Sequence, residues 1–409
     1  MFRLPRTFGA AIAVLMMVPP LARAQSPEQG GPDLAKVRVR IGPLSLNPTF
    51  GLSNAGIDTN IFNAPDQLAP KRDFTMTVTP ATDLWLRLGS TWLTGSIKED
   101  LVYYNKYASE RSANSRFTAG WLVPLNRLTV KVGTDYLSTR ERPGFEIDTR
   151  SQRYEFGYAG SVEIRALSKT FFGLQGSHRN VNYDKGAVFL NSNLQFELNR
   201  TTTAGRVTVR HQLTPLTSLT LEVGRDQDRF EFSPLRNSNS TQISVGVKFD
   251  PFALIKGSAS FGYRDFEPLL PGLPGYQGST ALVDLSYVAL GSSKLGLKIA
   301  RDVQYSYDIN QPYYLQTGLV ASIAQQIFGP VDVVGRVGAQ RLDYQNRVGV
   351  VVAALERADR VHSYGGGIGY HLGRDIRIGF NIDHSNRASA VALRQFNGLT
   401  YGTSVTYGL

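Results

Sequence analysis

The feature that most constrains the fold is a two-residue alternation of apolar and polar side chains that recurs along nearly the whole sequence. In the segment LTLEVGRDQDRFEF, residues 219–232, the apolar Leu219, Leu221 and Val223 alternate with polar or small residues. Such stretches begin near Leu44 and are about ten to fourteen residues long. The pattern predicts β-strands about twice as long as the five or six residues usual in soluble proteins.

Strands of this length indicate a lipid environment. A transmembrane β-strand needs about nine to eleven tilted residues, and only a closed barrel pairs all strand backbone groups inside lipid. No run after residue 24 approaches the roughly eighteen apolar residues of a membrane-spanning helix. The 19 tyrosines, the 21 phenylalanines and the absence of cysteine suit a β protein that folds without disulfides in an oxidising compartment. We therefore expect an all-β fold, a single transmembrane antiparallel up-and-down β-barrel, rather than a secreted β-sandwich.

The connections between the predicted strands alternate between short turns and long polar loops. Eight short connections are centred on residues 89–90, 124–126, 166–168, 214–217, 251–252, 291–293, 329–330 and 373–374. Nine long ones lie near residues 60–73, 105–111, 140–151, 183–201, 233–239, 267–278, 308–312, 345–359 and 385–394. Together they predict about 18 strands. Outer-membrane barrels keep their short turns in the periplasm, so we expect both chain termini there.

The amino-terminal segment MFRLPRTFGAAIAVLMMVPPLARAQ precedes the alternating region. Arg3 and Arg6, an apolar stretch at residues 8–18 and a small-x-small ending at Ala24 are typical of a secretory signal peptide. A membrane-anchoring helix is the alternative, but the apolar stretch is too short to span a bilayer and two prolines close it. We expect a signal peptide at residues 1–24, a flexible periplasmic linker at residues 25–36 and the barrel at residues 37–409.

Aromatic residues cluster near the predicted connections, as expected at the two interfaces of a membrane. Trp85, Trp92 and Trp121 lie within a few residues of short turns. A second group lies beside long connections: Tyr103, Tyr104, Phe230, Phe232, Tyr263, Phe266, Tyr305, Tyr307, Tyr313, Tyr314 and Tyr344. We expect the two groups to form girdles around the barrel.

The final segment, LTYGTSVTYGL at residues 399–409, is itself an amphipathic strand. We expect it to pair with the first strand and to turn its apolar face toward lipid. The ending also resembles the C-terminal assembly signal of outer-membrane barrels, with Leu409 where an aromatic residue is more usual. The assembly machinery and outer-membrane lipid are therefore expected partners.

Charge gives the main information about the lumen. The formal net charge of +11 falls to about +8 when the three arginines of the signal segment are removed. A lipid-facing Arg or Lys would cost about 2–4 kcal/mol at the bilayer midplane, so the alternation is expected to place charged residues in the lumen. The predicted pore-lining residues are Lys131, Arg153, Glu155, Glu163, Arg165, Arg206, Arg210, Glu222, Lys248, Lys256, Arg264, Asp284, Lys298, Asp302, Asp332, Arg336, Arg377 and Asp383. They either neutralise one another or, through their excess of cations, favour anionic solutes.

Sequence features that could suggest enzymatic or cofactor chemistry have simpler explanations. Asp383, His384 and Ser385 are adjacent, but neighbouring strand residues point to opposite faces, so a hydrolytic triad is not expected. The run GGGIGYHLG at residues 365–373 lacks the strand-turn-helix context of a phosphate loop, and its glycines instead suit a crowded or bending strand. The five histidines lack metal-ligand spacing. We expect no cofactor, and nucleic acid is not an expected partner at the outer membrane.

Two stretches carry a family resemblance. Residues 213–268 contain a Leu-x-Pro-Leu-Thr turn, an Asp-Arg-Phe strand end at residues 228–230, a Ser-Pro-x-Arg loop at residues 233–236 and a glycine-spaced strand ending at Tyr263. With the stretch LNPTFGLSNAGIDTNIF at residues 46–62, they resemble the outer-membrane β-barrel porin family associated with bacterial exopolysaccharide biosynthesis and export. The family's usual acidic pair before Asn60 is Asp58-Thr59 here. The resemblance implies a Gram-negative outer-membrane barrel acting in polysaccharide export or general permeation.

The connection NYDKGAVFLNSNLQFELNR, residues 182–200, is long for a structureless loop, and such loops tend to be functional. Leu194, Phe196 and Leu198 alternate with polar residues, which predicts an extended segment. The segment either stands above the membrane as a hairpin or folds into the lumen and narrows it. We favour the raised hairpin, because the period breaks at Thr201 before the next strand begins.

The sequence predicts a channel and not an enzyme. Export of an anionic exopolysaccharide is the favoured function, a general or anion-preferring diffusion porin is the alternative, and a membrane-embedded hydrolase is a distant third. Polysaccharide or small anionic solutes, and a periplasmic polysaccharide-export protein, are the partners that follow from this prediction.

Overall fold

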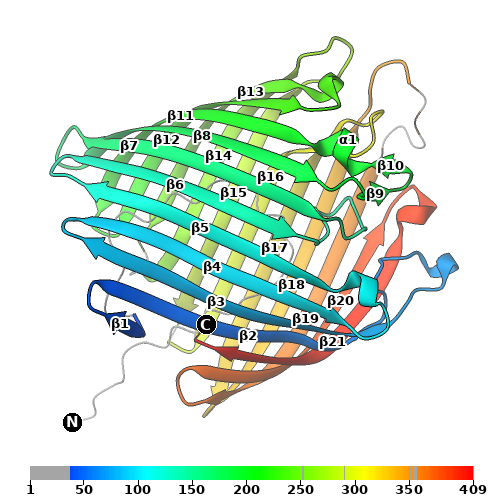
Figure 1. The fold of residues 1–409 in the computed structure, drawn as a ribbon, viewed down its shortest axis with the longest axis horizontal. Coiled ribbons are helices and arrows are strands. Elements are labelled where there is room, and N and C mark those ends of the chain that lie inside the picture. Colours follow the sequence, from blue (N-terminus) through cyan, green and yellow to red (C-terminus); the bar gives the residue numbers. More distant parts are fainter. Residues whose placement is uncertain (1–36, 251–252, 290, 351, 353–356, 409) are drawn as a thin grey trace.

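Eighteen long antiparallel strands form a sheet that closes on itself (Figure 1), in a computed structural model that describes residues 37–250, 253–289, 291–350, 352 and 357–408. Each strand pairs with the next, and the last strand, β21, pairs with both β20 and β2. This closure and the number of strands confirm the predictions. The strands are β2 (Leu44–Asp58), β3 (Asp73–Leu88), β4 (Thr91–Tyr104), β5 (Ser112–Pro124), β6 (Leu128–Thr139), β7 (Arg153–Arg165), β8 (Thr170–Tyr183), β11 (Arg200–Thr214), β12 (Thr217–Phe230), β13 (Ser238–Phe249), β14 (Ile255–Pro268), β15 (Tyr276–Ala289), β16 (Ser293–Tyr305), β17 (Tyr313–Phe328), β18 (Val331–Gln345), β19 (Ala358–Leu372), β20 (Ile376–Ala388) and β21 (Phe396–Tyr407).

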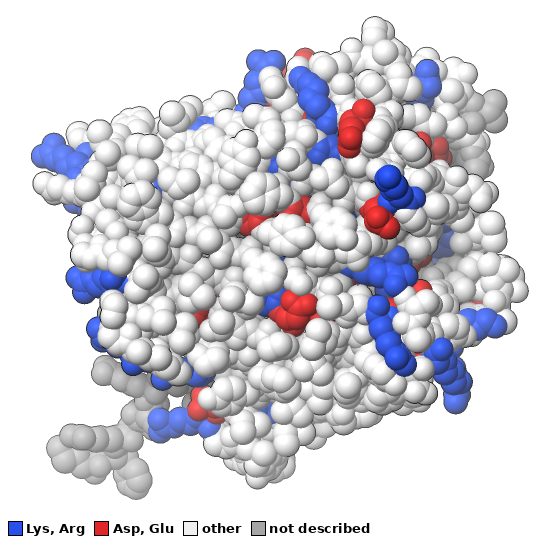
Figure 2. Space-filling view, in the orientation of Figure 1, with Lys and Arg blue, Asp and Glu red and all other residues white. Residues whose placement is uncertain are grey.

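The alternation in the sequence sets the two faces of the wall. In β12, Leu219, Leu221 and Val223 are 37%, 42% and 44% exposed on the outer face, whereas Asp226 on the opposite face is buried. Side chains of successive strand residues point to opposite faces, so one face is apolar and the other polar along each strand. Figure 2 shows one side of the outer surface as mostly uncharged, with most Lys and Arg toward its two ends. This surface suits contact with lipid.

The short turns and the long connections lie at opposite ends of the barrel (Figure 1). Glycines with positive φ allow several of the tight turns, including Gly89 (φ 61°), Gly329 (φ 51°) and Gly373 (φ 66°). A short strand, β1 (Val39–Ile41), pairs with β2 at the short-turn end. We call the opening at the long-connection end the mouth.

The wall is interrupted beside the mouth. β15 and β16 pair only as far as Ala281 and Arg301, whereas β16 and β17 remain paired up to Tyr305 and Tyr313. The tip of the β16–β17 hairpin therefore separates from β15. Its Tyr313 is 1% exposed and packs edge to face on Phe266 of β14, with ring centroids 4.9 Å apart.

The connection between β8 and β11 differs from the sequence prediction. It contains a small hairpin, β9 (Val188–Phe189) and β10 (Ser192–Asn193), followed by the helix α1 (Leu194–Leu198). The predicted extended segment is therefore wrong. Asn193 caps the helix by accepting a hydrogen bond from the Gln195 backbone nitrogen at 2.9 Å, and the four-residue spacing places Leu194 and Leu198 on one face.

The aromatic residues beside the long connections are also placed differently from the prediction. Tyr263 is exposed on the outer face, as a girdle requires, but most of the group is buried: Tyr104, Phe230, Phe266, Tyr307, Tyr313, Tyr314 and Tyr344. Their rings pack on one another and on connections that turn inward. Proximity to a loop did not distinguish a ring facing lipid from one packed inside the mouth.

The predicted signal peptide, the linker at residues 25–36 and Leu409 lie outside the described residues. Among the residues that the structure describes, no helix has the length and apolar character needed to cross a bilayer.

Candidate functional site

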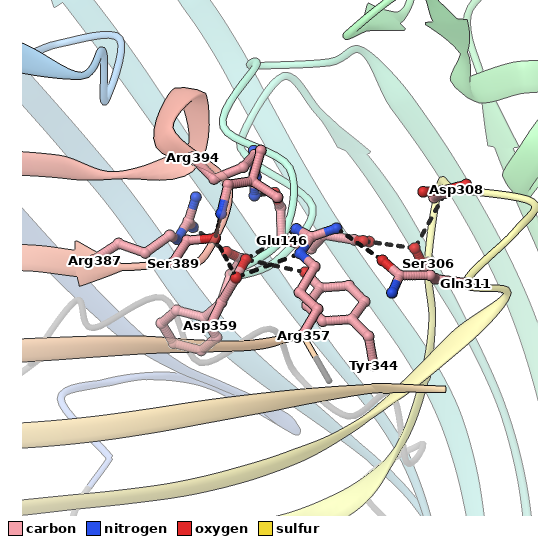
Figure 3. A network of polar contacts seen from close by, with 12 residues as sticks. Glu146, Ser306, Asp308, Gln311, Tyr344, Arg357, Asp359, Arg387, Ser389 and Arg394 are labelled. Atoms are coloured by element: carbon pink, nitrogen blue, oxygen red, sulfur yellow. Dashed lines mark hydrogen bonds and ion pairs between the residues drawn. The ribbon is translucent and has the colours of Figure 1, made fainter. Parts of the chain in front are cut away.

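One long connection crosses the mouth. The mouth loop, residues 140–152, joins β6 to β7, which lie nearly opposite β16 and β17 in the ring of strands. Its Glu146 nevertheless accepts hydrogen bonds from the Ser306 hydroxyl at 2.6 Å and from the Tyr307 backbone nitrogen at 3.2 Å, both in the β16–β17 connection. Figure 3 shows these groups converging from different elements. The mouth loop therefore spans the barrel and is fastened on its far side.

A second carboxylate fastens the same loop to the end of β20 and to the β20–β21 connection. Asp148 lies 2.6 Å from Arg387 and 2.7 Å from Arg394, measured from one carboxylate oxygen to each guanidinium nitrogen. The two arginines also donate to the backbone carbonyls of Phe145 and Glu146. Both guanidinium groups are almost fully buried, and the loop supplies acceptors for their terminal nitrogens.

The network continues into the β18–β19 connection (Figure 3). Arg357 pairs with Asp359 at 3.0 Å and donates to Gln311 at 3.2 Å. Its guanidinium carbon lies 3.8 Å from the centre of the Tyr344 ring. Asp359 also accepts a hydrogen bond from Ser389 at 2.5 Å. Four long connections are thus joined by polar contacts at the mouth.

A second loop packs beside the first. The cover loop, residues 184–199, joins β8 to β11, and its Phe189, Leu194 and Leu198 are buried against Ile147 of the mouth loop and Tyr307. This packing contradicts the expectation of a raised hairpin. The apolar face of α1 is buried because the loop turns across the mouth. In a hairpin raised above the membrane, the same face would be exposed to water.

Arg236, in the β12–β13 connection, ties the cover loop to the β16–β17 tip. Its side chain is fully buried and pairs with Glu197 of α1 at 2.8 Å. It also donates to the backbone carbonyls of Ser306, Tyr307 and Pro312. One guanidinium therefore binds three backbone carbonyls where the hairpin tip leaves the wall.

Burial shifts the ionisation of the groups at the mouth. Desolvation raises the pKa of the Glu146 carboxyl above its usual value, despite the Ser306 hydrogen bond and the nearby Arg357 and Arg394. Desolvation also lowers the pKa of Arg236, although Glu197 opposes that change. The closed arrangement therefore places Glu146 where its charged form is disfavoured.

Below the mouth, a belt of alternating charges spans six neighbouring strands of the inner wall, from β11 to β16. Arg206 lies 2.9 Å from Asp226, Asp226 lies 3.4 Å from Arg264, and Arg264 lies 3.2 Å from Asp302. These residues belong to β11, β12, β14 and β16, and Gln242 of β13 accepts a hydrogen bond from Arg264 at 3.1 Å. The belt lines a groove of about 340 Å³ with charged, amide and hydroxyl groups.

Similar pairs extend the polar wall in both directions. Arg179 bridges Asp135 at 2.8 Å and Glu155 at 3.3 Å, and Glu155 pairs with Arg153 at 2.7 Å. Nearer the short turns, Arg210 pairs with Glu163 at 2.8 Å. Because each guanidinium has a carboxylate within reach, this part of the wall is close to electroneutral.

Across the lumen, β18–β20 carry two more pairs. Arg336 pairs with Asp383 at 2.8 Å, and Asp332 accepts hydrogen bonds from Arg377 and His371, each at 2.5 Å. The glycine run of β19 makes room for them, since a Cβ at Gly365 would collide with the Asp383 carboxylate. These glycines are therefore explained by packing, because the absence of a side chain leaves space for the charged pairs.

The family model "Putative beta-barrel porin 2" matches residues 32–408, nearly the whole chain. The chain belongs to this family. The barrel is an outer-membrane, porin-like channel. No curated protein matches the sequence.

Several solved outer-membrane proteins are similar to this chain at low sequence identity. OpdK from Pseudomonas aeruginosa is 11% identical, with 88% of this chain and 98% of that chain covered and a TM-score of 0.47. A BenF-like porin from Pseudomonas fluorescens Pf-5 is 11% identical, with 90% and 98% covered and a TM-score of 0.47. The FrpB iron transporter from Neisseria meningitidis is 10% identical, with 88% and 64% covered and a TM-score of 0.43.

In this porin, the charged residues that the alternation predicts to line the pore lie on the face opposite the exposed apolar residues. Most of them pair with a carboxylate or guanidinium of the same face, including Lys298 with Asp284 at 3.3 Å and Arg206 with Glu222 at 3.4 Å. Arg165 instead lies over the ring of Phe171, which also contacts Arg210. Lys131 is buried, whereas Lys248 and Lys256 are exposed near the short turns. Their role in conduction stays a prediction.

Sequence reasoning missed the residues at the mouth. Glu146, Asp148, Arg236, Arg357 and Arg394 lie in connections where the two-residue period stops, so no periodic signal marked them. Asp226 could have been predicted from the alternation, because it is in phase with Glu222 along the same strand. Arg179 could have been predicted because it lies in register with the inner face of the neighbouring strand, which carries Glu155.

The strand geometry places Asp383 and its neighbour His384 on opposite faces of β20. Asp383 pairs with Arg336 on the inner face, while His384 lies 2.8 Å from the Asn397 side-chain oxygen. The porin family and this geometry favour a channel rather than an enzyme.

Proposed function

We propose that this porin conducts a saccharide chain outward across the outer membrane, and that the chain is the anionic exopolysaccharide implied by the sequence resemblance. The supporting observation is the charge-paired groove beneath the mouth. Its guanidinium, carboxylate, amide and hydroxyl groups offer both donors and acceptors, which is what sugar hydroxyls require. The long connections lie outside the cell in this proposal, and both termini lie in the periplasm.

The short-turn end would then be the periplasmic entrance, and it is cationic. Lys248 of β13, Lys256 of β14 and Lys294 of β16 lie near the short turns on the polar face of the wall. A positive entrance attracts carboxylate-bearing or sulfated sugars before they reach the neutral groove.

A diffusion porin is the second candidate. At least seven of the eleven predicted lumen cations have a carboxylate within 4.0 Å, namely Arg153, Arg206, Arg210, Arg264, Lys298, Arg336 and Arg377. Such a self-neutralising wall suits small hydrophilic solutes of either charge sign.

Planar-bilayer recordings would test the proposal. Oligosaccharides of uronic acids, added on the short-turn side, are expected to block the current transiently and more often than neutral oligosaccharides of equal length. The double variant Lys248→Gln/Lys256→Gln should lower the blocking frequency several-fold. Lys169→Gln, in an exposed short turn, is the matched control and should leave that frequency unchanged.

A deletion strain distinguishes the two candidates in the cell. Loss of surface polysaccharide would support export. Unchanged surface polysaccharide, together with free passage of small solutes in the bilayer, would reject export and leave the diffusion porin.

A further inference from the structure

Three arginines form a row across four neighbouring strands. By strand register, Arg301 of β16 lies opposite Thr317 of β17, Thr317 lies opposite Arg341 of β18, and Arg341 lies opposite Arg360 of β19. Neighbouring strands are about 4.8 Å apart, so the three arginines fall within roughly 15 Å along the sheet. We call this set the arginine row.

By strand alternation the arginine row lies on the outer face of the barrel, and Arg301, at the point where β15 and β16 separate, also borders the groove below the mouth. Arg341 shares its face with Val337, and Arg360 shares its face with Tyr364, because residues two or four apart point the same way. Val337 and Tyr364 are both exposed. Arg336, which pairs with Asp383 in the lumen, lies on the opposite face from Arg341.

The row lies at the edge of the apolar surface. Toward the short turns, the outer face of the same strands exposes large apolar or aromatic side chains: Leu295, Leu319, Ile323, Val333, Val337, Tyr364, Ile368 and Tyr370. At about 2.5 Å of height per residue of a tilted strand, the row lies roughly 20–30 Å above the short turns, where an apolar band about 25 Å tall ends. That level is the headgroup region of the leaflet on the mouth side.

The contacts within the row leave a net positive charge at that level. Arg301 donates to the Ser279 backbone carbonyl at 3.1 Å and to the Thr317 hydroxyl at 2.8 Å, neither of which is charged. Arg341 pairs with Asp343 at 2.7 Å, and its side chain stays 54% exposed. Arg360 is exposed. Among the described residues, the contacts of the row therefore include one carboxylate for three guanidinium groups.

The other side of the barrel is different at the same end. The outer faces of β6 and β7 expose Tyr136, Tyr154, Phe156 and Tyr158, the aromatic residues usual at a membrane interface. A cationic row in place of an aromatic girdle means that one side of the barrel is suited to an anionic headgroup. Guanidinium groups bind phosphate through paired hydrogen bonds and hold it more strongly away from bulk water.

We propose that the arginine row binds the phosphate groups of lipopolysaccharide in the outer leaflet. This inference rests on the proposed orientation, with the mouth outside, but it does not depend on what the channel conducts. Charge complementarity and the position of the row select this lipid, since its phosphates lie at the level where the apolar band ends.

A binding titration tests the proposal. The purified full chain in neutral detergent is titrated with bisphosphorylated lipopolysaccharide and with the same molecule after enzymatic dephosphorylation. The phosphorylated form should bind at least about tenfold more tightly, because each arginine near a charged headgroup raises the binding affinity about five- to tenfold. Equal affinity for the two forms would overturn the proposal.

The double variant Arg341→Gln/Arg360→Gln should weaken binding of the phosphorylated form by about tenfold or more and leave binding of the dephosphorylated form unchanged. Arg127→Gln/Arg374→Gln removes two exposed arginines from short turns at the other end and is the matched control. Equal loss in both double variants would show only general charge attraction and would also overturn the proposal. If the row variant fails to fold, the comparison of the two lipids on the unmodified chain still decides. Bilayer conductance of the variants reports separately on the channel.

Discussion

At the residue scale, the mouth is held by a few buried charges from distant parts of the chain. Asp148 lies between Arg387 and Arg394, and Glu146 reaches the β16–β17 tip. Removing one partner of a buried pair leaves the other desolvated without compensation, which costs about 3–5 kcal/mol. Single substitutions should therefore release whole loops.

Asp148→Asn should undock the mouth loop, because two nearly buried guanidinium groups lose their shared carboxylate. We expect a several-fold rise in single-channel conductance with the barrel still folded. Asp375→Asn, which removes an exposed carboxylate from a short turn, should leave conductance unchanged. A wild-type conductance in the Asp148 variant would show that this pair does not keep the mouth loop across the lumen.

The raised pKa of Glu146 predicts how closure of the mouth depends on pH. Its pKa is raised in the docked loop, chiefly by desolvation, so the docked state is favoured most below about pH 4.5 and loses this advantage as pH rises through the raised pKa. Each pKa unit changes the ratio of docked to undocked loops by about tenfold. The open probability should therefore fall on acidification across that window.

Glu146→Gln should flatten this pH response, since the amide keeps the size of the side chain and cannot ionise. The measurement is open probability against pH for both proteins. A response of the same size in the variant would assign the titration to another carboxyl near the mouth, such as Glu141 of the mouth loop, whose pKa burial also raises.

At the element scale, the cover loop closes the mouth by packing, whereas the mouth loop closes it by charge. The helix α1 is only five residues long and has too few backbone hydrogen bonds to be stable alone. Leu194 and Leu198, buried against Ile147 and Tyr307, supply the stabilisation that the backbone lacks.

Leu194→Ala should loosen the cover loop, since emptying a buried leucine site costs about 2–5 kcal/mol. We expect larger current noise and a higher mean conductance, and deletion of residues 184–198 should raise conductance several-fold. Leu190→Ala changes an exposed leucine of the same loop and should have no effect. Unchanged conductance after the deletion would place the narrowest point elsewhere.

At the scale of the whole molecule, the barrel exists only if its first and last strands meet. β2 and β21 pair across a register shift between Leu52 and Ala55, and a Cβ at Gly56 would collide with the backbone of β21. Closure at this seam satisfies the edges of both strands at once, which lipid requires.

Gly56→Val should therefore hinder closure. The fraction of protein that shows heat-modifiable migration on a gel should fall sharply, while wild-type protein shows this migration and a β-rich circular dichroism spectrum in detergent. Gly205→Val is the control, because a Cβ there meets only open space. Equal folded fractions for the two variants would mean that the seam tolerates the added side chain.

The sequence by itself determined the wall. Period-two alternation in strands about twice the usual length fixes which side chains face lipid, and the lengths of the connections give the number of strands. These are local properties, readable one strand at a time, and for the same reason Arg336 and Asp383 could be assigned to the inner face before their pairing was known.

Only the tertiary structure decided what closes the mouth and how the lumen charges combine. Glu146 meets Ser306, and Asp148 meets Arg394, across sequence separations that no local period encodes. The cover loop reads as an extended segment by alternation, yet Leu194 and Leu198 turn into one helical face because Ile147 and Tyr307 offer a buried surface. The alternation likewise predicts that arginines line the lumen. Which carboxylate each arginine pairs with depends on which strands become neighbours around the closed ring. The wall follows from the chain's own periodicity, whereas the mouth depends on contacts that exist only after the ring has closed.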